Sequence, residues 1–147
     1  MITRRRFVSA TAATLAVSAL PALAQRAPRV SVYKNAACGC CGEWVKHMQA
    51  SGFRVETTNV DDVTPIRRRN GVPDALASCH TALVGGYALE GHVPAADVWR
   101  LLRERPALQG LAVPGMVAGS PGMEQGLPQR YATIAFDERG SHVFAQH

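Results

Sequence analysis

Three features are missing from this 147-residue sequence. It has no internal repeat. Its longest apolar stretch is too short for a transmembrane helix and lacks the flanking residues typical of one. It also has no basic patch with interleaved aromatic residues, and aromatic residues make up only 6% of the chain. The length predicts one domain, and the missing basic patch gives little support to a nucleic-acid partner.

The N-terminal residues predict an export signal. Residues 4–6 are three arginines, residues 7–20 form an apolar run, and residues 22–24 are an A-x-A cleavage site. The segment TRRRFV resembles a twin-arginine signal, with the general secretory route as the alternative. We therefore expect a signal peptide over residues 1–24, a single domain over residues 25–147, and a periplasmic protein with no membrane span after cleavage. A retained N-terminal anchor is the competing interpretation.

Removal of the signal brings the net charge close to zero. The full chain has 16 lysine and arginine residues against 11 acidic residues, and three of the arginines lie in the signal. The mature chain then carries 13 basic residues and a net charge of +2. Its only charge run, IRRRN over residues 66–70, is typical of a solvated helix face or a turn.

The hydrophobic periodicity predicts the element order β-α-β-α-β-β-α, in which the first β-α-β unit pairs its strands in parallel with a right-handed crossover. The glycine- and proline-rich stretch after the last helix is expected to be an ordered loop. A strand, a turn and a second short strand should end the chain. The expected ranges are strand 30–34, loop 35–42, helix 43–52, strand 53–60, short helix 63–71, β-hairpin 78–93, helix 94–106, loop 110–129 and C-terminal β-hairpin 131–144.

Only four cysteines occur, and three of them fall within four positions of the segment ACGCCGEW: Cys38, Cys40 and Cys41. Cys38 and Cys41 form a C-x-x-C motif beside the β-α-β pattern, which predicts a thioredoxin-like α/β fold with a mixed sheet and flanking helices. Adjacent cysteines leave little room for two ordinary structural disulfides. A helix N-terminus stabilises a thiolate, which is both a nucleophile and a metal ligand. The position therefore allows thiol–disulfide chemistry and metal binding alike.

The fourth cysteine, Cys79, opens the predicted third core strand, CHTALVGG. In a thioredoxin-like fold this place lies against the C-x-x-C turn and usually holds a cis-proline followed by threonine. Here Cys79 and His80 precede Thr81, so possible ligands replace a substrate-binding element. Since consecutive side chains of a strand point to opposite faces, we expect His80 to point away if Cys79 faces the turn.

Further soft ligands stand where packing explains them poorly. Met116 and Met123 lie in the glycine- and proline-rich loop, with few large apolar neighbours, whereas Met48 belongs to the apolar face of the first helix. His92 lies between the hairpin and the next helix. Thiolate and thioether ligands together favour Cu(I). The other histidines, His47, His142 and His147, fit no pattern, and the last two are expected on the surface.

Three segments together resemble a bacterial family long classed as having unknown function, whose characterised type is the copper-resistance protein CopG. They are YKNAACGCCGEWVKHMQASGFRV, SCHTALVGGYALEGHVPAADVWRLL and LAVPGMVAGSPGME. The resemblance extends from about residue 30 to about residue 143. It implies a periplasmic thioredoxin-like protein with a small copper cluster and a role in copper tolerance. The ligands it implies are Cys38, Cys40, Cys41, Cys79, His92, Met116 and Met123.

The leading hypothesis is therefore a periplasmic copper-binding protein in which thiolates bridge a multinuclear Cu(I) cluster. Its expected partners are copper ions and periplasmic copper-efflux or redox proteins. Cycling of copper between Cu(I) and Cu(II) is a further hypothesis, so the sequence leaves enzymatic activity open. The alternatives are a thiol–disulfide oxidoreductase that uses Cys38 and Cys41, and a non-catalytic copper chaperone. Zinc is a weaker option, because two methionine ligands would be unusual for it.

Overall fold

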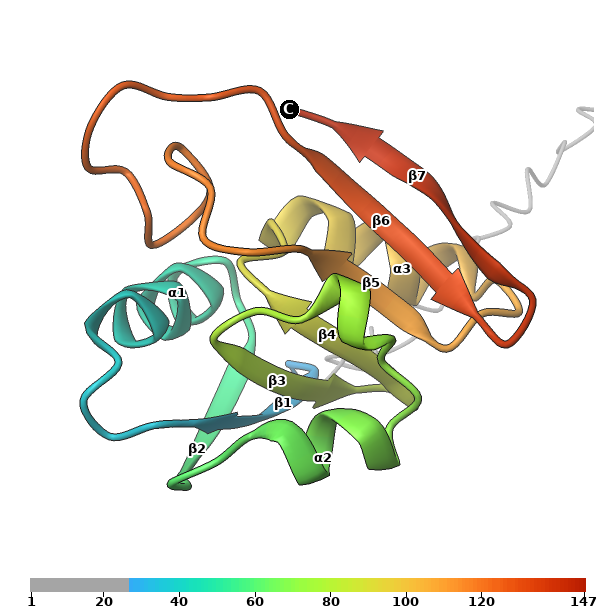
Figure 1. The fold of residues 1–147 in the computed structure, drawn as a ribbon, viewed down its shortest axis with the longest axis horizontal. Coiled ribbons are helices and arrows are strands. Elements are labelled where there is room, and N and C mark those ends of the chain that lie inside the picture. The colour runs from blue at the N-terminus through green and yellow to red at the C-terminus, as the bar shows by residue number, and fades with distance from the viewer. Residues whose placement is uncertain (1–26) are drawn as a thin grey trace, which may run out of the picture.

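The computed structural model describes residues 27–147, which form a seven-stranded mixed sheet with three α-helices and one short 3₁₀ helix (Figure 1). The predicted signal peptide, residues 1–24, lies outside the described residues. Within 27–147, none of the helices has the length and apolar character needed to cross a membrane. The predicted α/β class with a mixed sheet is therefore confirmed for this part of the chain.

The first three elements form the predicted parallel β-α-β unit: β1 (Arg29–Lys34), α1 (Gly39–Ala50) and β2 (Arg54–Asn59). Helix α1 begins at Gly39 rather than at the expected residue 43, so Cys40 and Cys41 lie in its first turn and Cys38 is its N-cap residue. The two glycines of this turn have low helix propensity, which hides the helix start in the sequence. The hydrogen bond from the Cys38 N–H to the Asn35 carbonyl leads the chain into the helix (3.0 Å).

The next elements follow the predicted order: α2 (Thr64–Arg69), η1 (Asp74–Leu76), β3 (His80–Val84), β4 (Tyr87–Gly91) and α3 (Ala95–Glu104). Strands β3 and β4 pair antiparallel, as expected for a hairpin. Gly85 and Gly86 have φ values of +56° and +91°. Two successive residues with positive φ are what a tight hairpin turn requires, and glycine adopts such values without steric cost.

The expected loop over residues 110–129 is wrong at its start, because Gly110–Val113 forms strand β5. This strand pairs in parallel with β4, and all four of its residues are buried. A side-chain carbon on Gly110 would lie 2.0 Å from the Ala88 carbonyl oxygen, so only glycine allows the two strands to approach. The glycine that suggested a loop is therefore a strand residue at a close backbone contact.

The C-terminal hairpin is confirmed as β6 (Ala132–Asp137) and β7 (Gly140–Gln146), which extends two residues beyond the expected end. The complete strand order is β2-β1-β3-β4-β5-β6-β7. Helices α1 and α3 pack on one face, where Trp44 and Met48 meet Val98 and Leu101 over the sheet. Residues of the α2–η1 segment, such as Val72, pack against the other face. The loop over residues 114–131 leaves β5 and lies beside α1 (Figure 1).

Candidate metal centre

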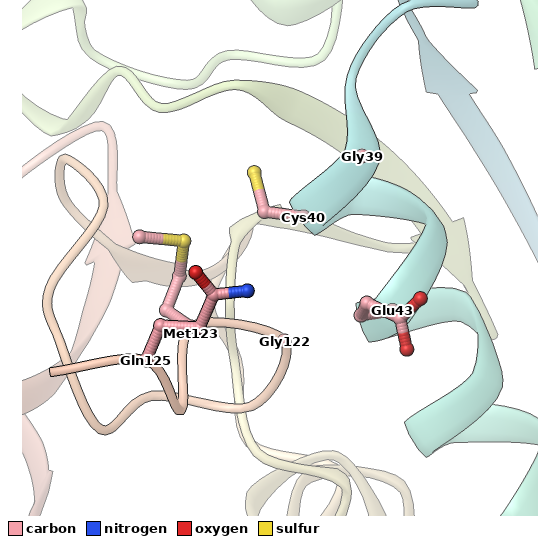
Figure 2. A pocket seen from close by; sticks show the side chains of 6 residues that line it. All are labelled: Gly39, Cys40, Glu43, Gly122, Met123 and Gln125. Carbon is pink, nitrogen blue, oxygen red and sulfur yellow. The ribbon is translucent and has the colours of Figure 1, made fainter.

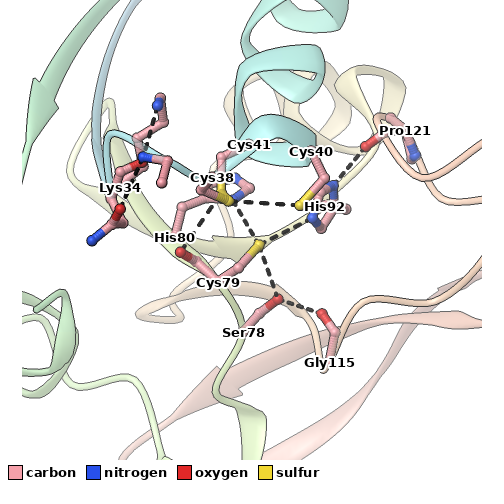
Figure 3. The surroundings of a disulfide bond; sticks show 12 residues. Lys34, Cys38, Cys40, Cys41, Ser78, Cys79, His80, His92, Gly115 and Pro121 are labelled. Atoms are coloured by element: carbon pink, nitrogen blue, oxygen red, sulfur yellow. Dashed lines mark hydrogen bonds between the residues drawn. A yellow bond between two sulfur atoms is a disulfide. The ribbon is translucent and has the colours of Figure 1, made fainter.

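All four cysteines converge where β1 leads into α1 and where the chain enters β3 (Figure 3). Their sulfur atoms lie within 4.8 Å of one another. Cys38 and Cys41 form a disulfide, while Cys40 and Cys79 are free thiols. The Cys40 Sγ is half-buried and lies 3.6 Å from the Cys38 Sγ, so Cys40 points toward its neighbours. The structure thus brings together every cysteine that the sequence placed at the site.

His92 faces the Cys79 thiol from the end of β4. Its Nε2 lies 3.1 Å from the Cys79 Sγ, and its Nδ1 lies 2.7 Å from the Pro121 carbonyl oxygen. Because a carbonyl oxygen only accepts, Nδ1 carries the proton and Nε2 directs a lone pair toward the sulfur. Burial lowers the pKa of His92, and the hydrogen bond to Pro121 opposes that shift. The neutral ring is therefore oriented as a metal ligand would be.

His80 also belongs to this cluster, contrary to the expectation that it points away. Its Nδ1 lies 3.4 Å from the Cys79 Sγ, and its ring centroid lies 4.5 Å from that of Trp44. Cys79 lies just before strand β3, so the alternation of faces that holds within a strand does not separate the two side chains. Burial lowers the His80 pKa to about 3, and within residues 27–147 its Nε2 has no hydrogen-bond partner. The adjacency of cysteine and histidine was the only signal in the sequence.

A buried ion pair fixes the segment that carries Cys79. The Arg67 guanidinium donates to the Glu90 carboxylate (2.8 Å) and to the Ser78 carbonyl (2.7 Å). The Ser78 N–H and the Thr81 hydroxyl donate to the same carboxylate, at 2.7 and 2.6 Å. The charge run IRRRN is therefore not simply a solvated face, since Arg67 turns inward from α2. Both backbone groups of Ser78 are held, which fixes the backbone beside Cys79.

The thiol of Cys79 is not ionised at neutral pH without a metal. Burial raises its pKa to about 12, with a further contribution from Cys40. Binding of a metal ion at this sulfur would release the proton, because a metal ligand must be a thiolate. Binding at this position should therefore strengthen as the pH rises.

A pocket of about 400 Å³ opens beside the cluster, between α1 and the 114–131 loop (Figure 2). Cys40 and Glu43 line it from the helix, and Met123 lines it from the loop. Gly122 brings the loop against the helix, since a side-chain carbon there would lie 2.7 Å from the Cys40 carbonyl oxygen. Met116 is 57% exposed and does not line this pocket. Of the two loop methionines, Met123 is the one that shares this pocket with a cysteine.

The remaining histidines lie away from the sulfur atoms. His47 of α1 accepts a hydrogen bond at Nε2 from the Ala95 N–H at the start of α3 (3.0 Å). His142 is exposed, as expected. His147 is exposed too, as expected, and its ring stacks on Tyr131 and bonds to Asp97 (2.8 Å).

The fold and the site together define a mixed α/β protein with a cysteine–histidine cluster whose donor atoms are close enough to hold a metal ion.

The model of the family described as "Protein of unknown function, DUF411" matches residues 76–123. Two solved structures of copper resistance protein CopG are similar to this chain over nearly its whole described length. Form 2 is 43% identical with a TM-score of 0.78, and covers 82% of this chain and 98% of its own. Form 1 is 44% identical with a TM-score of 0.76, and covers 81% and 96%. No curated protein matches the chain. The protein belongs to the CopG family.

Proposed function

We propose that this protein binds copper as part of copper resistance, in a cluster held by Cys38, Cys40, Cys41, Cys79, His92, Met116 and Met123. The observation that carries the proposal is the convergence of four cysteine sulfurs within 4.8 Å. The relatives at 43–44% identity are named for copper resistance, which supports copper as the ion. Thiolate sulfurs so close together bridge neighbouring Cu(I) ions well, because soft ligands favour that oxidation state.

The copper-binding state requires reduction of the Cys38–Cys41 disulfide, because a disulfide sulfur is not a thiolate ligand. Two electrons and two protons convert the disulfide to two thiols, and copper then displaces the protons. Met123 reaches the cluster from the 114–131 loop through the pocket it shares with Cys40. Met116 completes the coordination after a movement of its exposed side chain. Cycling of copper between Cu(I) and Cu(II) is part of the proposal, with periplasmic redox or copper-efflux proteins as partners.

The proposed scaffold is a thioredoxin-like domain over residues 25–147, exported to the periplasm by the signal peptide over residues 1–24. The strand order β2-β1-β3-β4 and the C-x-x-C motif at the start of α1 support it. Strands β5 to β7 and the 114–131 loop extend that unit on the β4 side. An oxidising compartment also agrees with the disulfide in this structure.

A thiol–disulfide oxidoreductase is the second candidate, and the Cys38–Cys41 disulfide favours it. The two functions make different demands on Cys40 and Cys79. Disulfide exchange needs only the C-x-x-C pair, so replacing Cys79 by serine should leave exchange intact. A copper cluster bridged by Cys79 should lose metal in the same variant.

The deciding experiment is a Cu(I) titration of the reduced protein under anaerobic conditions, with the ligand types determined by X-ray absorption. The proposal expects at least about two copper ions per chain, since bridging thiolates are shared between metals. Sulfur should dominate the coordination shell. Binding of fewer than two ions would exclude a multinuclear cluster.

The methionine ligands are tested by conservative substitution. Met116→Leu and Met123→Leu keep apolar volume but remove the thioether sulfur, so each should weaken Cu(I) binding if its sulfur is a ligand. The double variant should bind more weakly than either single variant. Leu127→Ala in the same loop, where Leu127 is 88% exposed, is the control and should bind normally. Unchanged affinity in the double variant would remove both methionines from the site.

A further inference from the structure

We infer that Cys79, His80 and His92 form a second metal site, for a single divalent ion of borderline softness, that stays complete while Cys38 and Cys41 are joined in their disulfide. The inference rests on the proposed function only in that both use Cys79 and His92. It adds His80 as a ligand and a different oxidation state of the protein. In this state the four-sulfur group has lost two of its thiol donors, whereas the group of one sulfur and two imidazoles is untouched.

The donor atoms already have almost the spacing that a tetrahedral ion needs. The Cys79 Sγ lies 3.1 Å from the His92 Nε2 and 3.4 Å from the His80 Nδ1. With metal–sulfur and metal–nitrogen bonds of about 2.3 and 2.0 Å, tetrahedral geometry separates sulfur and nitrogen by about 3.5 Å. The two sulfur–nitrogen distances therefore need to change by only a few tenths of an ångström, and the two imidazole nitrogens lie within 4.8 Å of each other.

The protein also prepares both imidazoles for this role. The Pro121 carbonyl holds the proton of His92 at Nδ1, so that Nε2 is free to bind. His80 is fully buried between Trp44 and His92, and its Nε2 has no hydrogen-bond partner in the described part of the chain. A buried polar group without a partner destabilises the fold, and an apolar ring in this place would avoid that cost. A histidine placed there despite that cost is explained if its other nitrogen binds an ion.

The donor set selects the class of metal. Two imidazoles and one thiolate suit Zn(II) and Cu(II), whereas Cu(I) prefers the sulfur-rich group that reduction creates. Three protein ligands leave the fourth position of a tetrahedral ion for solvent or another small ligand. Reduction of the disulfide would therefore exchange one binding mode for the other, with Cys79 and His92 shared between them.

The test uses the purified protein in its disulfide form, verified by a count of two free thiols per chain. Zn(II) and, in a second arm, Cu(II) are titrated separately, with calorimetry for zinc and thiolate-to-copper charge-transfer absorption for copper. We expect one ion per chain, and we expect His80→Phe to weaken its binding by about 100-fold or more, while His142→Phe, at an exposed histidine, binds as the parent does. Cys40→Ser should leave the divalent ion in place. Dependence on His80 in either arm supports the site, and the arm that responds identifies the ion.

Three results would overturn the inference: no binding of either ion, equal binding by His80→Phe, or loss of binding in Cys40→Ser. Cu(I) uptake by reduced His80→Phe reports whether that variant folds, because the proposed copper cluster does not use His80. The same titration separates the two proposals. Failure of the parent protein to bind Cu(I) when reduced rejects the cluster alone, and failure of the disulfide form to bind divalent ions rejects the second site alone.

Discussion

Replacing Arg67 by methionine tests whether the buried ion pair with Glu90 holds the cysteine-bearing segment in place. The two side chains are 9% and 0% exposed and lie 2.8 Å apart. Methionine keeps most of the apolar volume but leaves the carboxylate with only the neutral donors of Ser78 and Thr81. Leaving one charge of a buried pair without its partner costs about 3–5 kcal/mol. We expect a loss of that size in the free energy of unfolding, measured by urea denaturation.

The matched control is Arg68→Met, one residue further along the same helix. Arg68 pairs with Asp74 at 3.2 Å, but both side chains are about two-thirds exposed (66% and 67%). An exposed pair of this kind contributes about 0–1 kcal/mol. Adding Glu90→Gln to Arg67→Met should restore part of the lost stability, because the uncompensated charge is gone. Equal losses for Arg67→Met and Arg68→Met, or no recovery in the double variant, would refute the reasoning.

Two further predictions concern the supports of helix α1. Gly122→Ala should lower the melting temperature and weaken Cu(I) binding, since its side-chain carbon would lie 2.7 and 2.8 Å from backbone atoms of α1. The matched control is Gly126→Ala, because Gly126 has a similar φ (+89° against +86°) but open space around it. This control should lose only the roughly 1–2 kcal/mol of stability that positive φ costs a residue with a side chain. Equal effects of the two substitutions would contradict the close contact at Gly122. Burial lowers the pKa of His47, so folding loses stability as the pH falls below the unfolded value of about 6.5. His47→Gln, which keeps an acceptor for the Ala95 N–H but does not titrate, should show a shallower decline between pH 7 and 5 in urea unfolding; an identical pH dependence would exclude this contribution.

Elements with a clear hydrophobic period were predictable from the sequence, and those with close backbone contacts were not. Strand β1, the β3–β4 hairpin and helix α3 follow the alternation or the apolar stripe that their residues show. Strand β5 was missed because Gly110 resembles a loop residue, although it is needed where β5 approaches the Ala88 carbonyl. Glycine density alone therefore does not separate a loop from two strands in close contact.

The candidate site shows the same division. The cysteines and His92 stood out by type and spacing, and the structure brings them together. The alternation of faces wrongly predicts that His80 points away from the cluster, because Cys79 lies one residue before strand β3 begins. The arginine run predicts a solvated face for Arg67 as well, because a sequence does not show which of three arginines meets a buried carboxylate from a distant strand. Both errors concern contacts between elements far apart in the chain.

The distribution of buried polar side chains explains why these contacts matter for the site. Eight polar or charged side chains are buried within residues 27–147. Five of them either contact the Cys79 sulfur or belong to the ion-pair network that fixes the backbone beside it: Arg67, His80, Thr81, Glu90 and His92. Apolar residues of similar volume in place of a buried ion pair are often neutral or stabilising. Stability alone therefore does not account for so many polar groups around one cysteine. The need to fix the position of the Cys79 sulfur accounts for them, because a metal site whose ligands lie about 1 Å out of place loses its preferred geometry.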